Sequence, residues 1–117
     1  MIIVNSKDLF GKKELEKTAG MLIALNKNII IFGLPYSGKS TLVKAVCKTD
    51  KNFKTIPEEE LLSDQDIKTV LKKSTDFWCV SHQYPSQKQD VSEHYLNKFA
   101  EKMDLDLKKW RIVKILK

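Results

Sequence analysis

The stretch "NIIIFGLPYSGKSTLV", residues 28–43, contains the pattern that decides how this chain folds. It begins with four successive apolar residues, Ile29–Phe32, which are typical of a strand buried on both faces of a sheet. Gly33 and Gly38 follow, and apolar residues then resume at helical spacing. A buried strand that passes through a glycine-containing turn directly into a helix predicts an α/β protein.

Helical and extended patterns alternate along the whole chain. Apolar spacing and capping signals predict helices over residues 12–26, 39–48, 64–73 and from 86 or 87 to about 103, the last with Val91, Tyr95, Leu96 and Phe99 facing the core. Apolar, β-branched and aromatic runs predict strands over 28–32, 53–56, 76–80 and 110–116, with residues 1–4 either a further strand or a frayed terminus and 81–87 a loop. This alternation predicts a small, mostly parallel sheet with helices on both faces, which is a three-layer α/β/α fold. We expect residues 1–117 to form a single domain, because no linker, repeat or low-complexity segment interrupts them.

The composition is that of a folded, basic chain. Hydrophobic residues make up 42% of the 117 residues and charged residues 31%, with both signs interleaved, which argues against disorder. Twenty lysines and one arginine give a net charge of +6, which favours polyanionic partners such as a nucleotide, a nucleic acid or an anionic surface. Lysines spread over solvated helix faces would give the same balance. Nucleic-acid binding has little further support, because no binding module is recognisable.

The termini and the cysteines predict a cytoplasmic protein. The N-terminal residues "MIIVNSKDLF" contain no basic segment before a long apolar core, so we expect no signal peptide. No apolar run approaches 18 residues, so no membrane span is expected. Cys47 and Cys79 are too few for a disulfide scaffold or a zinc site.

Residues Gly33–Ser40, "GLPYSGKS", match the pattern G-x-x-x-x-G-K-[ST]. In such a loop the glycines allow a sharp turn and a close approach of the main chain to phosphate oxygens. Successive amides at the start of the following helix form a site for an anion. We expect Lys39 to neutralise the β- and γ-phosphates and the Ser40 hydroxyl to coordinate Mg²⁺.

With these residues the chain resembles the P-loop NTPases, since "FGLPYSGKST" is a close match to their Walker A segment. The resemblance is strong over residues 28–43 and loose over the remaining helices and strands. It implies a P-loop NTPase core that binds ATP and Mg²⁺ through Gly33, Leu34, Pro35, Tyr36, Ser37, Gly38, Lys39, Ser40 and Thr41. Tyr36 occupies a place where many members have a small residue, often glycine, and its ring is expected to stack on a base, cover the phosphates or only pack against the loop.

Catalysis would need an acid that supports the metal and a group that orients water or removes a proton. No carboxylate follows the predicted strand "FWCV", where such an acid is usual, and Asp76 lies at the other end of that strand. The candidates besides Lys39 are therefore Glu58 and Glu59, provided that the strand 53–56 runs beside the loop strand, and His82. An acidic helix start and an ordinary loop histidine are the alternative interpretations.

Two longer stretches resemble secretion and packaging ATPases and their AAA+ relatives: "LIALNKNIIIFGLPYSGKSTLVKAV" and "IKTVLKKSTDFWCVSHQYPS". In the second, His82 and Gln83 resemble polar sensor residues. Every glycine lies at or before residue 38, so no D-x-x-G segment of a GTPase follows the loop, and ATP is the expected nucleotide. The resemblance implies a small Mg-dependent ATPase or switch that self-associates or uses a protein partner for missing catalytic groups. A small-molecule or nucleotide kinase and a degenerate nucleotide-binding protein are the alternatives.

Overall fold

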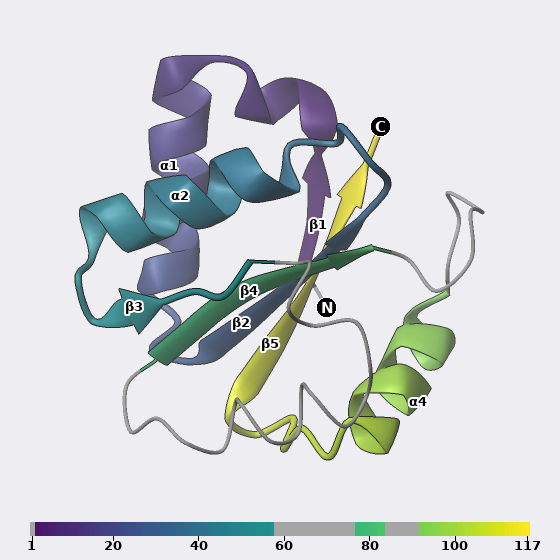
Figure 1. The fold of residues 1–117 in the computed structure, drawn as a ribbon. Helices are drawn as coiled ribbons and strands as arrows, with labels where there is room; N and C mark the ends of the chain where they lie inside the picture. The colour runs from purple at the N-terminus through teal and green to yellow at the C-terminus, as the bar shows by residue number, and fades with distance from the viewer. Residues whose placement is uncertain (1, 58–76, 84–91) are drawn as a thin grey trace.

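The computed structural model of the chain describes residues 2–57, 77–83 and 92–117, which form a mixed α/β fold around a five-stranded sheet (Figure 1). The strands are β1 (Ile2–Asn5), β2 (Asn28–Gly33), β3 (Phe53–Lys54), β4 (Phe77–Gln83) and β5 (Trp110–Leu116). The helices are α1 (Lys12–Ile23), α2 (Lys39–Thr49) and α4 (Glu93–Lys102), and a short 3₁₀ helix, η1 (Ser6–Leu9), follows β1. All four strand pairings are parallel, in the order β1-β5-β2-β4-β3, so β2 is the central strand.

Described helices lie on both faces of the sheet. Because side chains alternate along a strand, Ile29 and Ile31 of β2 point to one face and Ile30 and Phe32 to the other. The first pair packs with α1 and α2, and we call this side the α2 face. The second pair packs with Leu96, Ala100 and Met103 at α4, and we call this side the α4 face. Figure 1 shows α1 and α2 on one side of the sheet and α4 on the other.

Several strand predictions agree closely with the structure. The strand 110–116 is confirmed, and the chain start is a strand, β1, which pairs with β5. Trp78 and Trp110 are both buried in the sheet core. The predicted loop at residues 81–87 is wrong in its first three residues, because β4 continues through Ser81–Gln83. These polar residues are extended because they pair with Ile31–Gly33 of β2.

The helix boundaries differ from prediction at two points. Helix α1 ends at Ile23 rather than at 26, since Asn26 adopts a left-handed backbone with a φ of 53°. Helix α4 begins only at Glu93, after Ser92 accepts a hydrogen bond from the amide of Tyr95 as an N-cap. Tyr95 was expected to face the core, but it is 46% exposed, because the face of α4 on the sheet is formed by residues in phase with Leu96. The predicted helix 64–73 and residue Val91 lie outside the described residues.

The order of the strands corrects one expectation about the site. The predicted strand 53–56 is reduced to β3, and β3 pairs with β4 rather than with the loop strand β2. It is therefore separated from β2 by one strand, and β4 pairs directly with β2. Within the described parts of the chain, none of the helices has the length and apolarity needed to cross a membrane.

Candidate functional site

The loop after β2 lies at the carboxyl end of the central strand, which is where ligands bind in open parallel sheets. Gly33 ends the strand in a closely packed place. A Cβ atom on Gly33 would lie 2.6 Å from the Ser37 hydroxyl oxygen and 3.3 Å from the Ile115 Cβ. Only glycine therefore allows the loop to fold back onto the end of the sheet without displacing its neighbours.

Residues Leu34–Ser37 form a tight turn in which the Ser37 amide donates to the Leu34 carbonyl at 3.2 Å. Pro35 stands at its second position and Tyr36 at its third, where the φ of Tyr36 is 63°. Proline followed by a residue of positive φ is the pattern of a type II turn, in which glycine or asparagine is usual at the third position. This geometry explains why a small residue suits the position of Tyr36, whose side chain is 93% exposed.

Left-handed residues alternate with others through the second half of the loop. Tyr36 and Gly38 both have positive φ values, 63° and 102°, whereas Ser37 between them does not. Such alternation turns successive backbone amides toward one side, which creates a concave site for an anion. Gly38 is also the N-cap of α2, so this concave segment leads directly into the helix.

Lys39 is the first residue of α2, and its side chain is almost completely buried. Its ammonium group donates to the carbonyl oxygens of Gly33 and Leu34, at 2.9 Å each. The long side chain therefore runs back across the loop and places its positive charge where the main chain leaves β2. That charge adds to the positive end of the α2 dipole.

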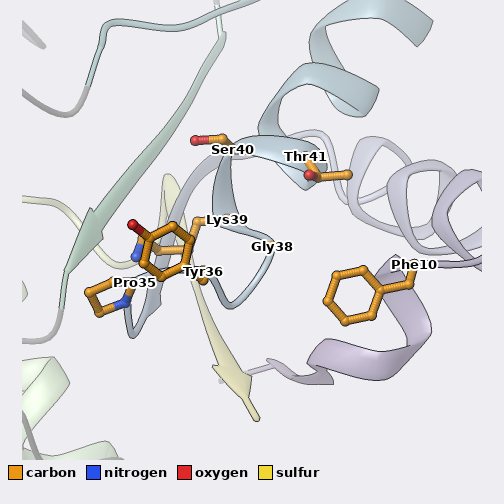
Figure 2. A pocket seen from close by; sticks show the side chains of 7 residues that line it. All are labelled: Phe10, Pro35, Tyr36, Gly38, Lys39, Ser40 and Thr41. Carbon is orange, nitrogen blue, oxygen red and sulfur yellow. The ribbon is translucent and has the colours of Figure 1, made fainter.

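A pocket of about 600 Å³ opens over the loop and the start of α2 (Figure 2). Its lining residues are Phe10, Pro35, Tyr36, Gly38, Lys39, Ser40 and Thr41. The first bond within α2 is donated by the Leu42 amide to the Gly38 carbonyl, so the amides of Ser40 and Thr41 precede the hydrogen-bonded part of the helix. One positive charge, two hydroxyl groups and a helix N-terminus together suit a phosphate group.

The helix η1 packs against the loop, a contact that the sequence did not predict. The buried Ser6 hydroxyl donates a 2.6 Å hydrogen bond to the Ser37 carbonyl. Leu9 is also buried and lies against Gly38, where a Cβ atom would come within 3.0 Å of the Leu9 Cδ1. No local pattern signals these contacts, because Ser6 and Ser37 are 31 residues apart in the sequence.

Of the candidate catalytic residues other than Lys39, the structure describes His82, which is not among the residues that line the pocket. Glu58 and Glu59 lie outside the described residues. The ring of His82 lies among aromatic side chains on the α4 face, with its centroid 6.0 Å from that of Phe32 and 5.5 Å from that of Phe99. The structure thus brings together the loop residues Gly33–Thr41, Lys39 among them, whereas the His82 ring lies on the α4 face of the sheet.

The last groups to place are the arginine and the possible metal ligands. Arg111, the one arginine of the chain, pairs with Ile29 near the amino end of β2, so its backbone lies at the end of the strands opposite to the loop. Among the residues that the structure describes, no group of three or more His, Cys, Asp or Glu side chains could hold a metal ion. Ser40, exposed in the pocket, is the residue of this loop that could bind a metal together with phosphate oxygens.

Comparison with models of protein families, with curated proteins and with solved structures finds no match for this chain. The geometry of the loop and its pocket is therefore the basis for any functional conclusion.

Proposed function

We propose that the chain binds a nucleoside triphosphate, ATP in the first place, together with Mg²⁺ in the pocket over residues Gly33–Thr41. One observation carries the proposal: a loop of the pattern G-x-x-x-x-G-K-S follows the central strand of a parallel sheet, has alternating left-handed residues, and leads into a helix N-terminus beside a buried lysine. The volume of about 600 Å³ is within the usual range for small-molecule sites.

The residues present fit such a ligand. The Lys39 ammonium supplies the positive charge for the terminal phosphates, and the amides of Ser40 and Thr41 supply donors at the positive end of α2. The Ser40 hydroxyl would be the protein ligand of Mg²⁺, and the metal would neutralise phosphate charge when it is bound. In this role the P-loop NTPase core is the fold that we propose for the chain.

We further propose that the chain acts as a small ATPase or an ATP-dependent switch within an assembly. The supporting observation is that Ser81, His82 and Gln83, none of them a carboxylate, form the end of β4 beside the loop strand β2, where an acid that supports the metal is usual. A second copy of the chain or a protein partner would contribute the groups that complete the site. A kinase and a protein that only binds nucleotide are the competing functions.

Calorimetric titration with Mg-ATP tests the binding site. We expect Lys39→Ala to weaken binding by about 10- to 100-fold, because it removes a charge-assisted contact with phosphate. Lys48→Ala is the matched control, since it removes an exposed lysine from the other end of α2 and is expected to leave binding unchanged. Because Lys39 also bonds the loop carbonyls, Ser40→Ala provides a second test, and it should reduce affinity more in the presence of Mg²⁺ than in its absence.

Turnover distinguishes the three functions. An assembly-dependent ATPase forms ADP at a rate per molecule that rises with protein concentration or with an added partner. A kinase transfers phosphate to an acceptor at a constant rate per molecule, and a binding protein forms no ADP under either condition. Equal binding of Mg-ATP by the parent chain and by Lys39→Ala would refute the proposed site.

A further inference from the structure

Phe10 is a large apolar residue at the pocket for which the proposed phosphate contacts leave no role. It lines the pocket, and 75% of its surface is exposed. Exposing an aromatic ring to water is unfavourable, and this exposed ring stands at the margin of the pocket, where a ligand could cover it. The four lining residues Gly38–Thr41 supply the features expected for phosphate, so Phe10 is available for a different part of a ligand.

The main chain holds Phe10 in a defined position beside the loop. It follows directly after Leu9, which is buried against Gly38, and it comes four residues after Ser6, which bonds the Ser37 carbonyl. Its own amide bonds the Lys7 carbonyl at 3.5 Å, and α1 begins two residues later. The backbone of Phe10 is therefore fixed on both sides, which reduces the entropy lost when a ligand contacts the ring.

The order of residues along the pocket indicates which part of a ligand Phe10 meets. Figure 2 shows Phe10 on the same side of Gly38 as Thr41, with Pro35 and Tyr36 on the other side. If Lys39 and Ser40 hold the terminal phosphates, a nucleoside triphosphate continues past the Thr41 amide toward Phe10.

We propose that Phe10 is the stacking surface for the nucleobase, so that the site takes a nucleoside triphosphate rather than an inorganic polyphosphate or a phosphorylated molecule without an aromatic group. This inference rests on the proposed function. A phenyl ring stacks on the π-face of any base and has no hydrogen-bonding group to read its edge, so it favours the presence of a base over its identity.

The experiment compares Mg-ATP with magnesium tripolyphosphate by calorimetric titration. The parent chain is expected to bind ATP more tightly than tripolyphosphate. Phe10→Ala should weaken ATP binding by about 5- to 100-fold and leave tripolyphosphate binding unchanged, because base stacking on an aromatic side chain contributes on that scale. Phe10→Trp should restore the preference for ATP. Tyr95→Ala, which removes an exposed aromatic side chain from α4, is the control and should change neither affinity.

Two results overturn the inference while leaving the proposed site intact. In the first, the parent chain binds ATP and tripolyphosphate equally; in the second, Phe10→Ala weakens both ligands by the same factor, as a purely structural role would. Lys39→Ala separates these from a failure of the proposed function, since it should weaken both ligands. If neither ligand binds the parent chain, or if Lys39→Ala leaves both affinities unchanged, the proposed function is refuted and the role of Phe10 with it.

Discussion

The hydrogen bond between Ser6 and Ser37 predicts that a residue outside the pocket lining controls the loop. In Ser6→Ala the buried Ser37 carbonyl loses a hydrogen-bond donor that lies 2.6 Å away. Leaving a buried carbonyl without this bond costs about 1–3 kcal/mol in the free energy of unfolding. For a chain of 117 residues this corresponds to a fall in Tm of about 4 °C per kcal/mol.

The same bond bears on ligand affinity. In a trans peptide unit the carbonyl and the amide point in opposite directions, so the bond to the Ser37 carbonyl also fixes the direction of the Gly38 amide. Without the bond the loop samples other orientations, and the fraction of molecules with the competent one falls. If one kcal/mol of restraint is lost, affinity for Mg-ATP is expected to fall by up to about 5-fold.

Urea unfolding followed by tryptophan fluorescence measures the stability term, since Trp78 and Trp110 are buried and become exposed on unfolding. Titration with Mg-ATP measures the expected loss of ligand affinity. Thr55→Ala, which removes an exposed hydroxyl group after β3, is the control and is expected to change the free energy of unfolding by less than about 0.5 kcal/mol. A change of that small size in Ser6→Ala would show that the bond contributes nothing and would refute the reasoning.

Two further predictions concern the loop and the core. Tyr36→Gly should not lower Tm, because glycine relieves the left-handed strain at a φ of 63°. This gain offsets the greater entropy of glycine in the unfolded chain. A loss of more than about 1 kcal/mol in the free energy of unfolding, measured by thermal unfolding, would contradict this prediction. Burial raises the pKa of the Cys79 thiol well above its usual range, with a further contribution from Cys47. The unfolded chain releases this proton near pH 8.5 and the folded chain keeps it, so stability should fall as pH rises above that value, by up to about 1.4 kcal/mol per pH unit. Urea unfolding at pH 8 to 10 under reducing conditions measures this effect. The free energy of unfolding should fall less steeply with pH for Cys79→Ala than for the parent chain, and equal slopes for the two would contradict the prediction.

The catalytic candidates show where prediction from the sequence reached its limit. Proposing Glu58 and Glu59 depended on the strand 53–56 lying beside β2, but β3 pairs with β4. Neighbouring order in a parallel sheet depends on crossovers between distant segments, and the local pattern "FKTI" contains no information about it. The exposure of Tyr95 was missed for a related reason, since the phase of α4 depends on where its Ser92 cap begins the helix.

The sequence by itself determined the buried strand over residues 28–32, the loop that follows it and the start of α2. Four successive apolar residues, two glycines and a lysine before Ser40 act through neighbours in the chain, so their consequences are readable locally. The tertiary structure alone decided that η1 packs against the loop, that Ser6 bonds Ser37 and that Phe10 lines the pocket. These contacts follow from the pairing of β1 with β5 and of β5 with β2, which brings the N-terminal segment to the loop from about 30 residues away.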